Sequence, residues 1–277
     1  MIDQIATRRL RIVKYRGSTH GTNEYPFLID ESGISVIPIT SLQLDYKSPT
    51  TIISTGIAAL DKSFSGNGIY KASSTLITGT AGTAKTILAS YFAMSGCRRK
   101  EPVLFFSFEE SPDQLVRNMA ALNINFKTPI KSKLLHIHAS RPSLQGLEMH
   151  LLVMSKLLEK LRPRTVIVDP ISSLITIGNS SEVRAMLVRL IDTLKMNEIN
   201  AVFTSLTHTN KSEFNDATVD AVSSLADTWI DLDSGQKNNE QVRSLLIVKS
   251  RGMGHINSRQ KFIITNKGIQ FTSTAKK

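Results

Sequence analysis

The sequence has almost no cysteine, since Cys97 is the only one in 277 residues. A lone cysteine can form neither an intramolecular disulfide nor a zinc site. The chain also has no apolar run approaching 18 residues, which excludes a transmembrane helix, and its start lacks the apolar stretch of a signal peptide. These absences lead us to expect a soluble cytoplasmic protein without membrane contact.

Acidic and aromatic residues are also scarce. Lys and Arg number 34 against 23 Asp and Glu, so the net charge is +11. This balance suits an anionic partner, whether nucleic acid, nucleotide phosphate or an acidic protein face. Aromatic residues make up only 6% of the chain, which leaves few platforms for stacking bases. Nucleic acid is therefore disfavoured as a partner but stays open.

The two ends of the chain repeat one another. Residues 9–36 align with residues 244–271 without gaps, at a constant offset of 235. The identical pairs include Leu10/Leu245, Ile12/Ile247, Val13/Val248, Lys14/Lys249, Arg16/Arg251, Gly17/Gly252, His20/His255, Phe27/Phe262, Ile29/Ile264, Gly33/Gly268 and Ile34/Ile269. We therefore expect residues 1–48 to be the end of a preceding repeat plus a linker, and 49–277 to be one complete repeat. The chain would then be a shortened relative, or a piece, of a tandem protein.

Between the two copies, strand and helix signals alternate as a parallel sheet with crossover helices requires. Strands are predicted at 73–78, 103–108, 134–138, 165–169 and 199–206, and helices at 85–97, 112–122, 145–160 and 182–195. Beyond residue 227 the pattern changes to a β-ribbon. The predicted fold class is α/β, with a mostly parallel sheet and a C-terminal antiparallel ribbon.

A glycine-rich segment follows the first of these strands and opens a helix. It reads Gly79, Thr80, Ala81, Gly82, Thr83, Ala84, Lys85 and Thr86. In this context it is a P-loop, whose backbone N–H groups surround nucleotide phosphates at a helix N-terminus. Lys85 would neutralise phosphate charge and the Thr86 hydroxyl would bind Mg²⁺. Ala84 replaces the usual glycine, which would cost about 1 kcal/mol if the position needs a positive φ.

Three carboxylates follow two of the predicted strands. Glu109 and Glu110 end the strand at 103–108, beside the P-loop edge of the sheet. Either can orient and deprotonate an attacking water, and Glu109 can also help to hold the metal. Asp169 is placed to assist magnesium binding. The alternatives are a helix-capping role for Glu110 and a turn role before Pro170 for Asp169.

Together these residues resemble the RecA-like ATPases, and within them the KaiC family of circadian-clock ATPases with two tandem domains. The resemblance covers essentially the whole chain. It depends on Ser54-Thr55-Gly56 with Leu60-Asp61, the P-loop, Phe108-Glu109-Glu110-Ser111, and Lys249-x-Arg-Gly-x-x-His255. It implies a RecA-like fold and a homo-hexameric ring with ATP at each subunit interface, together with Kai-type protein partners.

The resemblance also implies further site residues. Lys249, Arg251 and His255 would reach the neighbouring subunit's nucleotide, stabilising transition-state charge as arginine fingers do. Residues matching positions that line the same pocket are Arg243, Ser250, Met253 and Asn257, and Leu122 falls near the adenine. Ser223 and Ser224 match a hydroxyl pair that is phosphorylated from the neighbour's ATP. The alternatives are an exposed basic hairpin and a serine pair without chemistry.

Three functions follow from these patterns. The leading one is an ATP-hydrolysing ring that autophosphorylates and acts in signalling or timing. The second is a nucleic-acid motor or recombinase of the same fold, favoured by the net charge. The third, suggested by Ala84, is a non-catalytic ring held together by ATP. Fold analogy does not choose among them.

Overall fold

The computed structural model describes residues 8–21, 24–30, 33–36, 48–207, 222–237 and 240–272. The strands in this part are β1 (Arg9–Arg11), β2 (Glu24–Asp30), β3 (Gly33–Val36), β4 (Ile52–Ile53), β5 (Ile69–Tyr70), β6 (Ser74–Gly79), β7 (Val103–Ser107), β8 (Leu135–Ala139), β9 (Thr165–Asp169), β10 (Asn200–Leu206), β11 (Thr228–Lys237), β12 (Glu240–Ser250), β13 (Gln260–Thr265) and β14 (Gly268–Phe271). The helices are α1 (Ala58–Asp61), α2 (Lys85–Arg98), α3 (Pro112–Ala120), α4 (Lys127–Lys131), α5 (Leu147–Leu161) and α6 (Ser180–Met196), with 3₁₀ turns η1 (Pro142–Leu144) and η2 (Ile171–Thr176).

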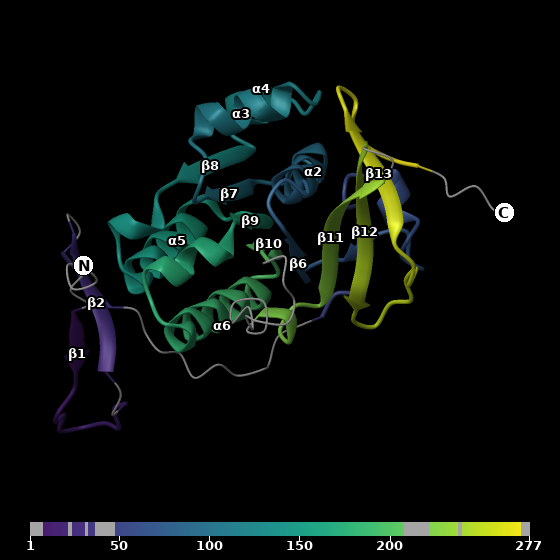
Figure 1. Cartoon of the computed structure of the whole chain (residues 1–277). Helices are drawn as coiled ribbons and strands as arrows, with labels where there is room; N and C mark the ends of the chain where they lie inside the picture. Colours follow the sequence, from purple (N-terminus) through teal and green to yellow (C-terminus); the bar gives the residue numbers. More distant parts are fainter. Residues whose placement is uncertain are drawn as a thin grey trace.

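In the described part of the chain, one nine-stranded sheet has the order β14-β13-β12-β11-β6-β10-β9-β7-β8. The strands from β11 to β8 run parallel, whereas β12, β13 and β14 are antiparallel. Helices α5 and α6 cover one face of the sheet and α2 and α3 lie on the other side (Figure 1). The predicted α/β class with a C-terminal antiparallel ribbon is therefore confirmed.

Burial explains why these elements form. Every residue of β6, β7 and β9 is buried, as expected for strands covered on both faces. Helix α6 places apolar side chains at helical spacing against the sheet, at Val183, Met186, Leu187, Leu190, Ile191 and Leu194. Its first turn is closed by a capping box, in which Asn179 accepts from the Glu182 amide and Glu182 accepts from the Asn179 amide.

The predicted elements differ from the observed ones by a few residues at their ends. The helix predicted to reach residue 122 ends at Ala120, because Asn123 takes a left-handed backbone conformation with φ of 59°. The short helix α4 was not predicted from the sequence. No helix among the described residues is long and apolar enough to cross a membrane.

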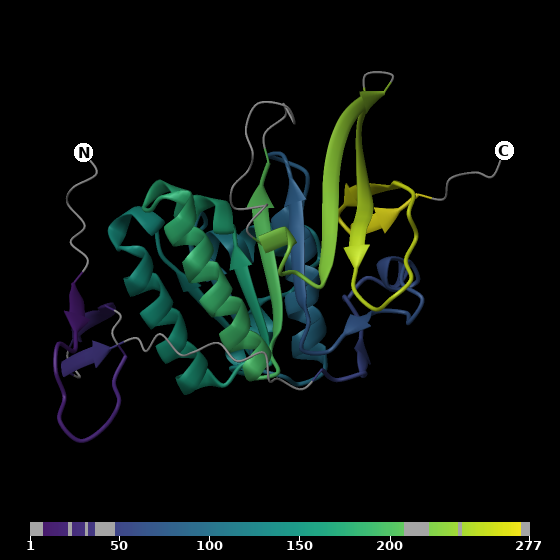
Figure 2. The same ribbon diagram turned by 90° about the horizontal axis from the view of Figure 1, so that it is seen from below.

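The terminal repeat has the same strand pairing at both ends. Leu10 pairs with Tyr25 and Ile29 pairs with Ile34, and the residues 235 positions later pair identically, Leu245 with Gln260 and Ile264 with Ile269. The N-terminal copy forms a separate three-stranded sheet, β1-β2-β3. It lies beside α5, at the opposite end of the molecule from the C-terminal ribbon (Figures 1 and 2).

The two copies differ in burial. Leu245 and Ile247 are each 1% exposed in the C-terminal ribbon, whereas Leu10 and Ile12 are 37% and 38% exposed in the N-terminal copy. The same apolar pattern therefore packs into the main core at one end only. Repetition of sequence and strand register does not by itself determine what covers the ribbon.

Candidate nucleotide site

The P-loop joins β6 to α2. Gly79 ends β6 with φ of 154°, and a Cβ there would lie 2.5 Å from the Leu232 carbonyl oxygen, so this close approach requires glycine. The loop then turns back, and α2 begins at Lys85. The Lys85 ammonium donates to the carbonyl oxygens of Gly79 and Thr80, both at 2.8 Å. The N-terminus of α2 and the Lys85 ammonium therefore both lie at the P-loop, as a phosphate-binding site requires.

Ala84 adopts a left-handed backbone conformation, which is the case in which we expected alanine to be strained at this position. Its φ and ψ are 82° and 26°, at the N-cap of α2. A non-glycine residue in this region costs about 1 kcal/mol. Ala84 as a residue is only 9% exposed and belongs to the apolar cluster beneath the loop, and this burial compensates part of that cost.

The three predicted carboxylates lie close to the P-loop. Strands β7 and β9 are neighbours, Ser107 pairs with Asp169, and the Phe108 amide donates to the Asp169 carbonyl oxygen at 2.8 Å. Glu109 accepts a hydrogen bond from the Ser173 hydroxyl at 3.0 Å. Glu110 instead accepts from the Asn118 side chain at 2.9 Å.

Glu110 therefore does not cap α3, which was the alternative role expected for it. Ser111 caps α3, accepting from the Gln114 amide at 3.3 Å, with Pro112 at the first helical position. Glu110 contacts α3 one turn further on, through Asn118. Asn118 and Ser173 were missed by the sequence analysis, because no local motif marks them.

Asp169 is the most buried of the carboxylates. Burial raises the pKa of its carboxyl to about 6, hydrogen bonds from Thr204 and Thr86 lower it, and the charges of Glu109 and Glu110 raise it. Burial also lowers the pKa of Lys85, against the opposing effect of Asp169 and Glu109. Removing one of these opposite charges would leave the other poorly compensated.

A cavity of about 460 Å³ collects these groups at the carboxyl edge of the sheet. Its volume falls within the range of small-ligand sites. The lining residues are Ala81, Gly82, Ala84, Lys85, Thr86, Ile87, Glu109, Glu110, Asn118, Met119, Leu122, Asp169, Pro170, Leu206, Arg243 and Ile264. The Thr86 hydroxyl, which bonds Asp169, and the Glu109 carboxylate are hard oxygen donors of the kind Mg²⁺ takes beside nucleotide phosphates.

Of the ribbon residues expected in the neighbour's pocket, Arg243 lies instead at this chain's own P-loop. It pairs with Ser234 across β11, and its Nε donates to the Gly82 carbonyl oxygen at 3.2 Å. The sequence alone could not place the Arg243 side chain at the P-loop, because only the pairing of β12 with β11 brings it there. Leu122 lines the same cavity, as expected.

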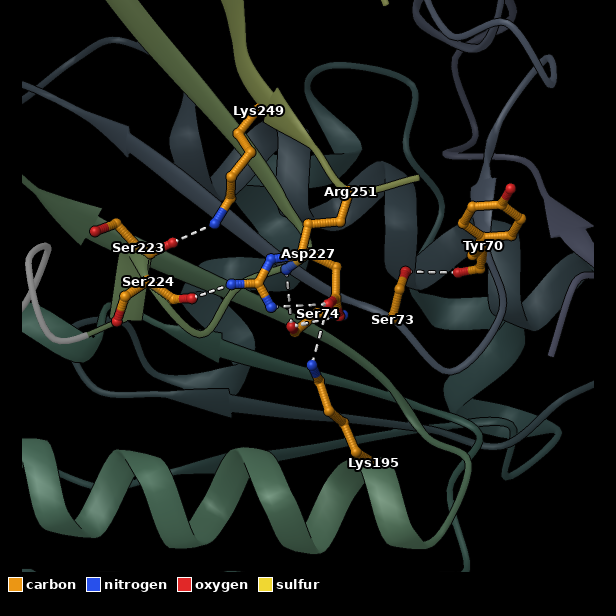
Figure 3. A network of polar contacts seen from close by, with 9 residues as sticks. All are labelled: Tyr70, Ser73, Ser74, Lys195, Ser223, Ser224, Asp227, Lys249 and Arg251. Carbon is orange, nitrogen blue, oxygen red and sulfur yellow. Dashed lines mark hydrogen bonds and ion pairs between the residues drawn. The ribbon is translucent and has the colours of Figure 1, made fainter. Parts of the chain in front are cut away.

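Lys249 and Arg251 lie at the other edge of the sheet. Lys249 pairs with Trp229, which pairs in turn with Leu76, three residues before Gly79. Its ammonium donates to the Ser223 carbonyl oxygen at 2.5 Å, and the Arg251 guanidinium donates to the Ser224 carbonyl oxygen (Figure 3). Burial lowers the pKa of Lys249 and the charge of Arg251 lowers it further, while Asp227 raises it.

The remaining predicted residues lie at the end of β12 and in the segment after it. Ser250 pairs with Thr228, and His255 forms a bridge with Phe64. Met253 is 9% exposed and belongs to the core beneath the ribbon, whereas Asn257 is exposed. None of the predicted residues from Lys249 to Asn257 lines the P-loop cavity. The structure thus places the P-loop residues with Glu109, Glu110, Asp169, Leu122 and Arg243 at one edge of the sheet, and Lys249 and Arg251 at the other, beside Ser223 and Ser224.

This fold and this P-loop define an ATPase of the RecA-like class. A family model described as "ATPase: KaiC" matches residues 1–41 and 53–276. The chain belongs to the KaiC family of RecA-like ATPases.

Several curated proteins are similar along nearly the whole chain. It is 46% identical over 268 residues to the circadian clock protein KaiC2 of Synechocystis sp., covering 97% of this chain and 47% of that protein. It is 32% identical to KaiC3 of the same organism, covering 97% and 53% respectively. It is 33% identical to the circadian clock oscillator protein KaiC of Thermostichus vulcanus, covering 95% and 50%. The chain spans about half the length of these relatives.

Proposed function

We propose that this chain binds Mg-ATP at the P-loop cavity and hydrolyses it at an interface with a second copy, within a hexameric ring. The observation that supports this is the separation of the cationic residues from the cavity in a single chain. Lys85, Thr86, Glu109 and Asp169 lie at the carboxyl edge of the sheet, while Lys249 and Arg251 lie at the amino edge.

The strand register gives the scale of this separation. Lys249 lies level with Leu76 of β6. Leu76 is three residues before Gly79, so Lys249 lies about 10 Å along the strand direction from the start of the P-loop. The Arg251 backbone lies further still from the loop, because the Arg251 amide donates to the carbonyl oxygen of Asp227, which is hydrogen-bonded to Ser74 at the start of β6. In a ring, these cations would instead meet the phosphates bound by the adjacent copy and stabilise the charge of the transition state.

Within the cavity each group has a proposed role. Lys85 would neutralise the phosphates, and Thr86, Asp169 and Glu109 would hold Mg²⁺, which would supply positive charge to stabilise the charge that develops on the departing ADP. Glu109, fixed by Ser173, orients the attacking water and accepts its proton. Arg243 contacts the nucleotide of its own chain, beside Gly82.

We also propose that Ser223 and Ser224 are phosphorylated from the neighbour's ATP, since both lie beside the residues expected at that nucleotide. Residues 1–48 would then be the end of a preceding repeat, and 49–277 the ATPase domain. The names of the relatives, which are circadian clock proteins, support a role in timing. A cytoplasmic location, a role in signalling and Kai-type protein partners are further parts of this proposal.

The test mixes two defective variants. Arg251→Ala keeps its P-loop but lacks the trans-acting cation, and Lys85→Ala has the reverse defect. Each alone should lose most phosphate release, whereas a mixture should recover activity at interfaces that combine an intact P-loop with an intact Arg251. Mass measurement with and without ATP verifies that the copies assemble together. A verified mixed ring without recovery would contradict the proposal.

Ala84 favours one alternative, a ring in which ATP is structural only, because its left-handed conformation strains the loop. Phosphate release separates the two functions. Wild-type rings that retain bound ATP without releasing phosphate would establish the structural role.

A further inference from the structure

Asp227 precedes β11 at the amino edge of the sheet, outside the P-loop cavity, and its carboxylate has several polar partners. Its Oδ2 accepts from both the amide and the hydroxyl of Ser74, each at 2.9 Å. Its Oδ1 accepts from the Lys195 ammonium at 3.1 Å. These contacts join β6, α6 and the start of β11 at one point (Figure 3).

Arg251 is attached to the same residue twice. Its amide donates to the Asp227 carbonyl oxygen at 2.8 Å, and its guanidinium lies 3.9 Å from Asp227 Oδ1. The guanidinium also donates to the Ser224 carbonyl oxygen. The Arg251 side chain is 52% exposed, yet Asp227 and the Ser224 carbonyl oxygen hold its guanidinium from two sides.

The surrounding charge makes this carboxylate difficult to replace. Lys195 is 8% exposed and points at Asp227 from the last turn of α6, while Arg251 approaches from β12. Lys249 lies close enough for Asp227 to affect its electrostatics. Without the carboxylate, three cations would repel one another, and Arg251 would move toward solvent.

We infer that Asp227 is a positioning residue for the trans-acting Arg251, with Ser74 and Lys195 holding its carboxylate in place. This inference rests on the proposed function at the subunit interface. Displacement of a catalytic group by about 1 Å can cost roughly 100-fold in rate. Asp227 would therefore affect turnover at the neighbouring copy's nucleotide, with little effect on the P-loop of its own chain.

A purely structural role is the competing explanation, because Asp227 also ties β11 to β6. Asp231, on the strand that directly follows Asp227, offers a matched control. It accepts from the Thr78 hydroxyl of β6 at 2.9 Å and from Arg259 at 2.7 Å. Asp231 therefore makes the same kinds of bond to the same neighbouring strand without contacting Arg251.

The experiment compares Asp227→Asn with Asp231→Asn in rings verified by mass. We expect both variants to lower the melting temperature. Asp227→Asn should also lower turnover at saturating ATP about 10-fold to 100-fold, with nucleotide affinity within about two-fold of the wild type. Asp231→Asn should keep turnover within about two-fold. Mixing Asp227→Asn with Lys85→Ala should restore activity, because the mixed interface pairs an intact P-loop with a correctly held Arg251.

Two results would overturn the inference. One is turnover of Asp227→Asn equal to that of Asp231→Asn. The other is an Asp227→Asn mixture that stays inactive although the Arg251→Ala mixture recovers, since the defect would then lie in its own chain. If the Arg251→Ala mixture itself fails to recover, the proposed function falls and this inference with it.

A second variant covers the case in which Asp227→Asn does not fold. The double change Asp227→Asn with Lys195→Met removes the lysine charge that faces Asp227 together with the carboxylate. The same loss of turnover and the same recovery in the mixture are expected for it. Wild-type turnover in this double variant would overturn the inference.

Discussion

Arg243 and Lys249 lie on the same strand, six residues apart, yet they are directed to opposite edges of the sheet. Arg243 donates to the Gly82 carbonyl oxygen in the P-loop, and Lys249 donates to the Ser223 carbonyl oxygen. Six residues of extended strand separate them by about 20 Å. One strand can therefore contribute to the nucleotide of its own chain at one end and to that of a neighbour at the other.

Glu109→Gln should keep nucleotide binding but lower phosphate release by roughly 100-fold or more, because an amide cannot accept the proton of the attacking water. Glu110→Gln is the matched comparison. Its side chain is tied to Asn118, so we expect a smaller loss. Equal hydrolysis by Glu109→Gln and the wild type would assign the general base to another residue.

Ala84→Gly should raise turnover if the methyl group restrains the loop. Glycine removes about 1 kcal/mol of left-handed strain but loses a buried methyl contact and gains freedom in the unfolded chain. We therefore expect the free energy of unfolding to change by less than about 1 kcal/mol. Steady-state phosphate release and thermal unfolding measure the two effects, and a slower variant would show that the loop has adapted to alanine.

Ser223 or Ser224 should become slowly phosphorylated when the purified protein is incubated with Mg-ATP. The carbonyl groups of both residues contact the cations expected at the neighbour's phosphates, and a carboxylate of the adjacent copy could accept the hydroxyl proton. Mass spectrometry should locate the phosphate. Ser223→Ala with Ser224→Ala should remove it and leave hydrolysis largely intact. An assembled, hydrolysing preparation without phosphate on either serine would indicate an ATPase without kinase activity.

His150→Gln should reduce the loss of stability in mild acid. His150 is 3% exposed, its Nε2 lies 3.1 Å from the Pro142 carbonyl oxygen, and burial lowers its pKa. Below about pH 6.5 the unfolded chain therefore binds a proton that the folded chain resists, so the free energy of unfolding falls as the pH falls. Thermal unfolding from pH 7 to pH 5 measures this. The exposed His136→Gln is the control and should follow the wild type, whereas parallel curves for His150→Gln and the wild type would contradict the assignment.

The sequence by itself determined the order of the parallel strands β6 to β10 and of the helices α2, α3, α5 and α6, together with the position of the P-loop. These features depend on local chemistry. Apolar spacing follows the geometry of a single helix or strand, and the loop motif needs only a strand before it and a helix after it. The terminal repeat was also visible in the sequence, as identical residues at a constant offset. In the structure the two copies form the same strand pairs.

Only the tertiary structure decided which residues share a site. Arg243 reaches the P-loop across 161 positions of sequence, and Lys195 meets Asp227 because α6 ends beside the start of β11. The hydrophobic pattern of the sequence does not predict these contacts, since they depend on strand register and helix packing between segments far apart in the chain. The same reason explains why Leu245 is buried while Leu10, with a similar sequence around it, stays exposed.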